Sequence, residues 1–168
     1  MANPSSQNLA VKSAYLIALP LVAILIVSSG AAAYYYSRYN QVEAQNKSYV
    51  EQLKKLGVEY SSHFLVDFGN GTQRWYNGTT FEPGTNVYVA TQVIAGGSVN
   101  ATYYTEYSEH LITAMFNIAN AGDNYWGLWT YNFNSTSGWQ LAQVGPDDLQ
   151  VTNGSTFAWS YGANSGPP

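Results

Sequence analysis

The sequence predicts an α+β protein in which a long N-terminal helix precedes a mainly antiparallel β-sheet with one short helix. Three observations support this class. Residues 14–33 form an apolar run without a single charge, and residues 34–56 contain neither Gly nor Pro, as expected of a continuous helix. From Val58 onward the hydrophobic residues follow a period of two, with turns rich in Gly and Asn between them, which is typical of strands.

The apolar run is long enough to cross a membrane. A helix of about twenty residues covers a bilayer core of roughly 30 Å. Three tyrosines follow at 34–36, with Arg38 next to them, and aromatic and basic residues favour the membrane interface. We therefore expect a transmembrane helix over residues 14–36, preceded by a polar tail over residues 1–13. The alternative is a signal peptide with Lys12 as its charged flank, cleaved near Ala33 to release a secreted protein.

Two patterns disagree on the orientation of this helix. More basic residues follow the run than precede it, and the positive-inside rule therefore favours a cytoplasmic C-terminal part. Glycosylation sequons favour the opposite side, because every usable N-x-[ST] motif lies beyond the run. Together with a surface composition poor in lysine, they predict a single-pass protein of the cell membrane with an extracellular C-terminal domain. The candidate glycosylation sites are Asn46, Asn70, Asn77, Asn100, Asn134 and Asn153.

Residues 37–57 are expected to form a helical stalk. A heptad frame fits this segment and the end of the run before it, with an Asn at one a position, which is a known device for fixing register. We expect self-association or a protein partner along this stripe; a lone helix resting on the domain or on a membrane partner is the alternative. Gly57 is expected to end the helix. The stripe places Tyr39, Asn46 and Leu53 at a, and Tyr35, Val42, Tyr49 and Leu56 at d.

The charge of the chain is unevenly divided. Residues 1–56 carry five basic side chains against two acidic ones, a net of +3, whereas residues 57–168 carry Arg74 alone against eight carboxylates, a net of −7. Such a domain would repel a phosphate backbone, so nucleic acid is excluded as a partner. The chain has no cysteine, which excludes disulfides and thiolate chemistry.

The remaining chain suits one domain over residues 58–162, followed by a Gly- and Pro-containing tail over 163–168 that we expect to be disordered. Residues 69–71 read Gly-Asn-Gly, a hairpin signal. A short helix is expected where apolar residues recur at helical spacing, although its β-branched residues leave a strand open. The predicted strands cover 62–68, 72–80, 99–107, 110–118, 124–131 and 156–161, and the helix covers 86–95.

The order strand, hairpin, strand, helix, strands resembles a β-grasp fold. Four local patterns make the region of about 58–162 similar to the transcobalamin C-terminal-like domain family: VDFGNGTQRWYNG at 66–78, Pro-Gly-Thr at 83–85, the Tyr125-Trp126 strand, and the closing turn and strand at 153–161. The family's Val-Asn-Gly and Gly-Asp positions read Thr-Tyr-Asn and Gly-Ser here. The resemblance implies an exported binding or adhesion module. Cobalamin is not the expected ligand, since the large helical domain of the vertebrate carriers is not found in this sequence.

No pattern predicts catalysis, a cofactor or a metal site. The two histidines, His63 and His110, lie in predicted strands without metal-ligand spacing. Asp147 and Asp148 follow Gly-Pro, where carboxylates commonly cap turns. Glu106 and Glu109 would point to opposite faces of an extended segment, which favours a solvated loop. We therefore expect a non-enzymatic protein.

The tryptophans are the strongest indication of a binding site. Alternation along 124–131 places Trp126 on one face and Tyr125, Trp129 and Tyr131 on the other. One face should be core, and the other could present an aromatic platform for a sugar, a tetrapyrrole or a protein strand. Core on both faces is the alternative. The candidate binding residues are Tyr125, Trp126, Trp129, Tyr131 and Trp139.

Overall fold

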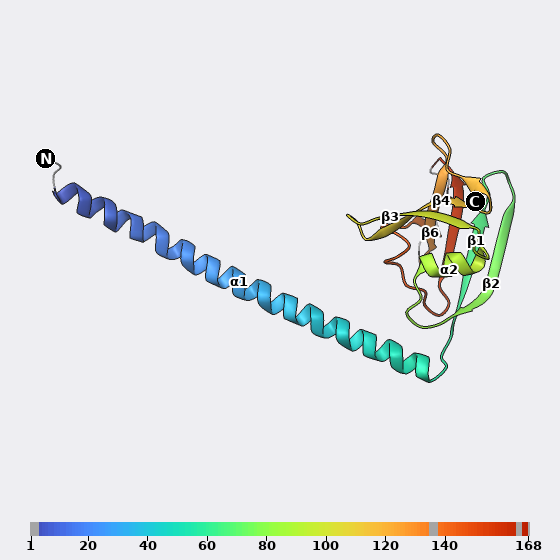
Figure 1. Cartoon of the computed structure of the whole chain (residues 1–168), viewed down its shortest axis with the longest axis horizontal. Coiled ribbons are helices and arrows are strands. Elements are labelled where there is room, and N and C mark those ends of the chain that lie inside the picture. Colours follow the sequence, from blue (N-terminus) through green and yellow to red (C-terminus); the bar gives the residue numbers. More distant parts are fainter. Residues whose placement is uncertain (1–3, 135–137, 164–165, 168) are drawn as a thin grey trace. The chain divides into compact units, whose positions relative to one another are not determined.

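The computed structural model describes the backbone of residues 4–134, 138–163, 166 and 167. It has a mixed α+β architecture with mainly antiparallel sheets, and over the described residues it contains two helices. The chain divides into two compact units, Met1–Tyr49 and Val50–Pro168. The long helix α1 (Pro4–Lys55) forms the first unit and enters the second with its last turn (Figure 1).

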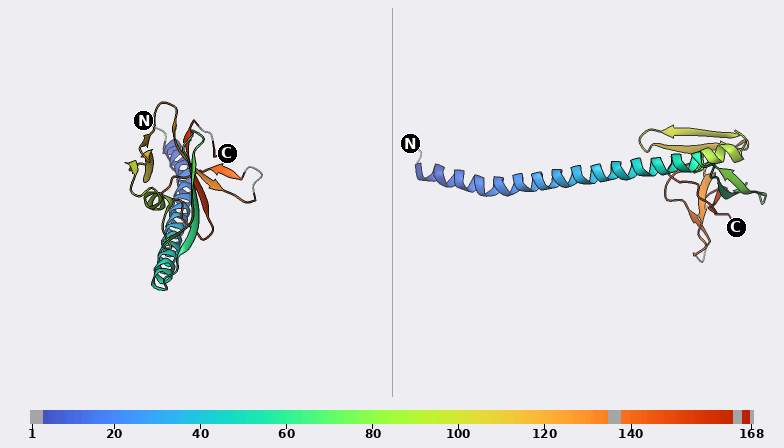
Figure 2. Two further views of the ribbon diagram at one scale, coloured as in Figure 1. Left: turned by 90° about the vertical axis from the view of Figure 1, so that its right-hand side faces the viewer. Right: turned by 90° about the horizontal axis from the view of Figure 1, so that it is seen from below.

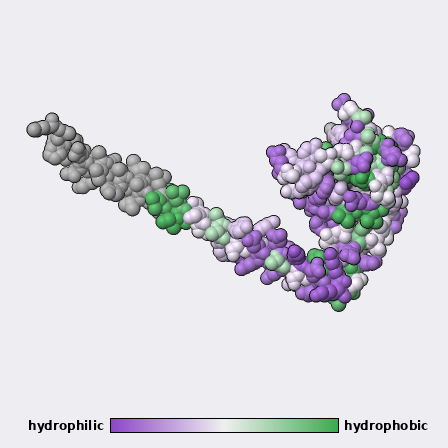
Figure 3. Space-filling model, in the orientation of Figure 1, coloured by the Kyte–Doolittle hydropathy of each residue, from purple (hydrophilic) through white to green (hydrophobic). Residues whose placement is uncertain are grey.

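The described side chains of α1 begin at residue 22, with residue 23 left out. Residues 22 and 24–27 are exposed and apolar, and Figure 3 shows them as a hydrophobic band that gives way to polar surface along the helix. Over the residues described, α1 contains no stretch whose length and hydropathy would let it span a bilayer. The side chains of residues 14–21, which belong to the predicted span, lie outside the described ones, so the span remains a prediction.

The helix ends as the sequence predicts. Gly57 adopts a left-handed backbone with φ +66°. Its N–H donates to the Lys54 carbonyl, and the Val58 N–H donates to the Leu53 carbonyl, so the last carbonyls of the helix are satisfied. Lys54 and Lys55 occupy the last turn, where their charge stabilises the negative end of the helix dipole.

The second unit contains a five-stranded sheet in the order β2-β1-β8-β6-β7. All neighbouring strands are antiparallel except β1 and β8, which are parallel. A three-stranded antiparallel sheet, β3-β4-β5, is separate. The strands are β1 (Tyr60–Asp67), β2 (Gln73–Phe81), β3 (Val99–Tyr104), β4 (Glu109–Met115), β5 (Ile118–Ala119), β6 (Tyr125–Tyr131), β7 (Trp139–Leu141) and β8 (Thr156–Gly162).

These strands confirm most sequence predictions. The β1–β2 hairpin turns at 69–71, and β6 and β8 lie where strands were expected. The predicted strand at 110–118 is two strands, because Phe116 and Asn117 adopt positive φ and reverse the chain between β4 and β5. The three-residue strand β7 was missed, since it is too short to show a period of two.

The segment after β2 is a helix, α2 (Val87–Ile94), and the alternative strand is wrong. Asn86 is its N-cap, and its side-chain oxygen accepts the Val89 N–H at 2.9 Å, which satisfies a free donor of the first turn. Ala90 and Thr91 belong to its buried face. Figure 2 shows α2 and the three-stranded sheet on the same side of the five-stranded sheet.

The main core lies between the five-stranded sheet and this covering layer. The inner face of the sheet contributes alternate residues of each strand, as the two-residue period requires, and α2 and β4 contribute their buried sides. The largest members from the sheet are Phe64, Phe81, Trp126, Phe157 and Trp159, packed with Val87, Ile94, Ile112 and Met115.

Candidate functional site

The outer face of the five-stranded sheet carries the candidate site. Strand registers define one row of side chains across this face. Leu65 of β1 pairs with Trp75 of β2 and with Ala158 of β8, and Ala158 pairs with Trp129 of β6. Directly paired residues share a face, so Trp75 and Trp129 stand at either side of a small, buried Ala158.

A second row runs beside the first. His63 of β1 pairs with Thr156 of β8, and Tyr131 of β6 pairs with Trp139 of β7. The β1–β2 register shifts between Ser62 and Phe64, and Gly78 has φ +65°, which is the geometry of a β-bulge with glycine in the left-handed region. The bulge places Asn77 beside His63 in this row.

Together the rows form an open groove of about 390 Å³. Trp75 and Trp139 come from the two edge strands, yet their ring centroids are only 6.4 Å apart with planes at 37°. Both indoles therefore lean inward over the strands that lie between β2 and β7. Trp75 is 47% exposed and Phe133 77% exposed. The lining residues are His63, Trp75, Asn77, Tyr131, Phe133, Trp139 and Thr156.

The aromatic rings of one wall support one another. Tyr131 meets Trp139 edge to face at a centroid distance of 5.0 Å and Phe133 at 4.8 Å, which are favourable geometries for aromatic pairs. Gly138 approaches the Tyr131 ring so closely that an added Cβ would lie 2.8 Å from its Cε2 atom. The β6–β7 connection thus positions this wall.

The polar groups of the groove are neutral side chains and a histidine. The Gly78 N–H donates to Nδ1 of His63 at 3.3 Å. Oδ1 of Asn77 lies 3.3 Å from the same Nδ1, and this contact requires the opposite tautomer, in which Nδ1 carries the proton. None of the described lining residues is Asp, Glu, Lys or Arg.

The five residues proposed from sequence have different positions. Tyr131 and Trp139 line the groove. Trp129 shares their face but is half-buried, and Gly166 lies against its ring, where an added Cβ would be 3.0 Å away. Tyr125 is exposed on that face without lining the groove.

Trp126 is a core residue, so its assignment to the binding platform is corrected. It is 3% exposed, and its indole N–H donates to the Ile118 carbonyl at 2.9 Å. The opposite placement of Trp126 and Trp129 confirms the predicted alternation. The Trp129 indole lies against Gly127, since its nitrogen is 3.3 Å from the position that a Cβ would take there.

Sequence reasoning missed five groove residues: His63, Trp75, Asn77, Phe133 and Thr156. Trp75 was visible as an aromatic residue in an edge strand, but only the strand order brings it opposite Trp139. Asn77 was considered only as a sequon. The bulge that places it beside His63 depends on Gly78, whose Asn-Gly sequence also fits an ordinary turn.

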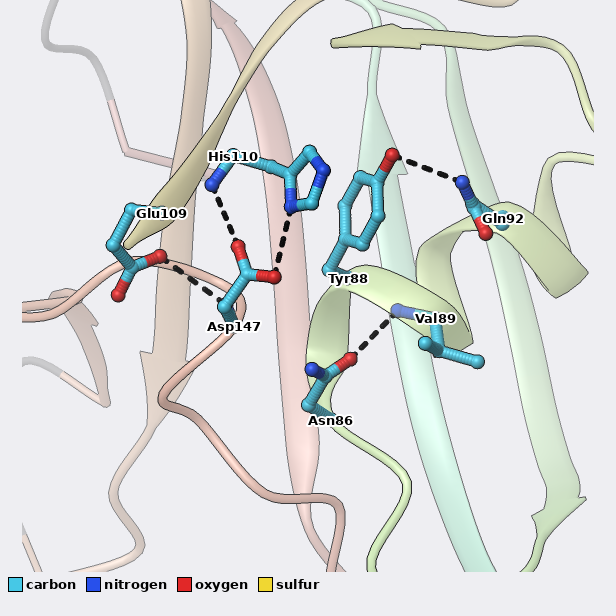
Figure 4. Close-up of polar contacts among 7 residues, drawn as sticks. All are labelled: Asn86, Tyr88, Val89, Gln92, Glu109, His110 and Asp147. Atoms are coloured by element: carbon cyan, nitrogen blue, oxygen red, sulfur yellow. Dashed lines mark hydrogen bonds and ion pairs between the residues drawn. The ribbon is translucent and has the colours of Figure 1, made fainter. Parts of the chain in front are cut away.

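A second polar cluster joins β4, α2 and the loop before β8 (Figure 4). Asp147 accepts the backbone N–H of His110 at 2.7 Å through Oδ2, and its Oδ1 lies 2.8 Å from Nδ1 of the same residue. The Tyr88 ring stacks on the imidazole at 3.8 Å with planes 6° apart. No spacing in the sequence indicated this pair, because 36 residues separate His110 from Asp147.

Glu109 lies beside this pair and is half-buried, which corrects its assignment to a solvated loop. Its carboxylate accepts the Asp147 N–H at 3.3 Å. Burial raises the pKa of Glu109 above its ordinary value; the Asp147 backbone hydrogen bond partly opposes this, and repulsion from Asp148 and Asp147 adds to it. Glu106, in contrast, is exposed.

Within the described part of the chain, no group of three or more His, Asp or Glu side chains could hold a metal ion. The sequon asparagines are all exposed, as glycosylation requires, although the side-chain oxygens of three of them make contacts. Asn70 accepts the Thr72 N–H, Asn153 accepts the Ser61 N–H, and Oδ1 of Asn77 lies 3.3 Å from Nδ1 of His63.

No protein-family model matches this chain, and no curated protein matches it either. Among solved structures, a protein from Ruminococcus gnavus ATCC 29149 with the description "putative metal binding protein" is similar. The similarity covers 64% of this chain and 100% of the other, at 15% sequence identity and a TM-score of 0.48.

Proposed function

We propose that the chain is a non-enzymatic, exported binding module whose outer-face groove binds a neutral glycan. One observation carries this proposal: two tryptophans from opposite edges of the sheet approach to 6.4 Å in a groove that His63, Asn77 and Thr156 also line. Exposed aromatic surface of this kind is costly to leave in water and usually marks a binding site.

The chemistry of the groove suits a sugar better than a charged or wholly apolar ligand. Indole and phenol rings present flat surfaces on which the C–H groups of a sugar ring can pack. Between the rings, the His63 imidazole, the Asn77 amide and the Thr156 hydroxyl offer donors and acceptors for hydroxyl groups. None of the described lining residues is Asp, Glu, Lys or Arg, although residues 57–168 carry a net charge of −7, so a neutral ligand avoids unpaired charge.

We also propose a β-grasp-like fold for this unit, akin to the transcobalamin C-terminal-like domains. The support is its topology: parallel first and last strands side by side within the sheet, an antiparallel neighbour on either side of that pair, and a helix after the second strand. Cobalamin is not proposed as a ligand, and no cofactor is proposed.

Residues 14–36 are proposed to tether the module to the cell membrane, with the C-terminal domain outside. The charge-free run and the sequons beyond it support this arrangement. Amino-terminal sequencing of the mature protein tests the tether. A retained run supports it, and a start at residue 34 would instead establish the secreted form.

Isothermal titration of the full chain with cellotetraose, chitotriose and mannotriose tests the groove. At least one sugar should bind, and Trp75→Ala or Trp139→Ala should weaken its affinity at least tenfold. Val93→Ala is the matched control, because Val93 is 58% exposed on α2, on the other side of the sheet. Unchanged affinity in both tryptophan variants, or no binding of any sugar, would refute the proposal.

A further inference from the structure

A second cavity lies on the inner side of the five-stranded sheet, next to β4. Its volume is about 490 Å³, which is within the usual range for small-molecule sites. Buried Ile112, Trp126 and Leu128 form its apolar base, and Tyr104 at the end of β3 and Tyr107 in the β3–β4 connection form part of its rim. It shares no lining residue with the glycan groove.

The indole N–H groups of this cavity and the backbone N–H beside Glu109 are already used as hydrogen-bond donors. The Trp126 indole N–H donates to the Ile118 carbonyl, and the Trp159 indole N–H donates to the Thr91 hydroxyl at 2.8 Å. The Asp147 N–H donates to Glu109. An anionic ligand would therefore meet aromatic carbon and carboxylate oxygen, which is an unfavourable environment.

None of the described residues that line the cavity is Lys or Arg. His110 also lines the cavity, but its imidazole is paired with Asp147 at 2.8 Å. Burial raises the pKa of Glu109, which lines the cavity, and repulsion from Asp148 and Asp147 adds to this shift. Arg74, the single Lys or Arg side chain of residues 57–168, lies over the Phe68 and Phe116 rings instead. A cation bound here would relieve this repulsion.

Gly145 leaves open the space that the Glu109 carboxylate occupies. A Cβ added at Gly145 would overlap the Glu109 carboxylate, so any larger residue would displace it. Gly145 and the buried Pro146 both line the cavity. Hydrogen bonds between Asp147 and His110 hold the loop that contains Gly145 and Pro146 against β4. The same loop donates the Asp147 N–H to Glu109, which positions the Glu109 carboxylate at the rim.

We propose that this cavity binds an organic cation, with its ammonium group against Glu109 and its apolar body on the apolar base formed by Ile112, Trp126 and Leu128. Tyrosine and tryptophan rings attract such a cation through their negative faces, and desolvation strengthens the attraction. A hydrated metal ion fits less well, because it gains nothing from apolar walls and the described residues offer no cluster of three ligands.

Isothermal titration of the full chain at pH 7 with 2-phenylethylamine, and with 2-phenylethanol as its neutral counterpart, tests this proposal. The amine should bind at least tenfold more tightly than the alcohol, and 3-phenylpropionate should not bind. Glu109→Gln should remove this preference while leaving the affinity for the alcohol unchanged. Glu106→Gln is the matched control, since it deletes an exposed carboxylate three residues away.

Two further measurements keep the test independent of folding defects and of the glycan groove. Gly145→Ala should weaken amine binding as Glu109→Gln does, because it displaces the carboxylate without changing its charge. Trp75→Ala should leave amine binding unchanged. Equal affinities for amine and alcohol, no amine binding at 20 mM, or equal effects of Glu109→Gln and Glu106→Gln in folded protein would overturn the proposal.

Discussion

Three tryptophans were proposed from the sequence as binding residues, and replacement of Trp126 by alanine should lower the stability of the fold more than replacement of either of the other two. The side chain is 3% exposed and packs on the Phe68 and Tyr161 rings. Truncation of a buried aromatic residue costs about 3–5 kcal/mol, and the Ile118 carbonyl loses its indole donor for a further cost of about 1 kcal/mol. For a unit of this size, the sum corresponds to a fall in melting temperature of roughly 15–25 °C.

Thermal unfolding of the full chain, followed by tryptophan fluorescence, measures this effect, since all five tryptophans lie beyond residue 57. Trp75→Ala is the matched control: this indole is 47% exposed, and its loss should cost less than about 1 kcal/mol. Equal melting temperatures for the two variants would refute the division of the sheet into a core face and a binding face.

Three other predictions follow from the same structure. Asp147→Ala should lower the free energy of unfolding by about 2–3 kcal/mol, because His110 loses both of its hydrogen bonds, whereas Asp147→Asn should recover part of this in chemical denaturation. The pKa of Glu109 is raised in the folded state, so protonation of this carboxyl favours folding, and the contribution is lost as pH rises through the folded pKa. Glu109→Gln should therefore be more stable than wild type at pH 7. This difference in stability should shrink below pH 4.5, where the wild-type carboxyl is protonated in both states. Tyr49→Glu should convert a stalk-mediated oligomer into a monomer in sedimentation experiments, whereas Ala44→Glu, on the opposite side of the heptad, should not; a wild-type monomer would contradict this prediction.

Local patterns in the sequence predicted the elements of the fold well. The Gly-Asn-Gly turn, the alternation around Trp126 and the helix after residue 86 could be read within short windows, because each depends on neighbouring residues. The end of α1 at Gly57 could likewise be predicted from neighbouring residues. The split between β4 and β5 was missed because positive φ at Phe116 is not expected of a bulky residue, although Asn117 beside it tolerates that conformation.

The candidate sites could be predicted only in part. Tyr131 and Trp139 were identified because both are aromatic residues near one strand. Trp75 could not be paired with Trp139 without the order of the strands, which places β2 and β7 at opposite edges. His110 and Asp147 are brought together by a loop contact over 37 residues, and no local pattern encodes such a contact.

Two-dimensional NMR of the indole N–H groups tests the central claim, that the outer face is a glycan site, most directly. Cellotetraose, chitotriose and mannotriose are added in turn to ¹⁵N-labelled full chain. At least one should shift the Trp75 and Trp139 signals and leave those of Trp126 and Trp159 in place, because the latter two N–H groups are bonded within the core. Signals of Trp75 and Trp139 that stay unmoved with every sugar would contradict the account.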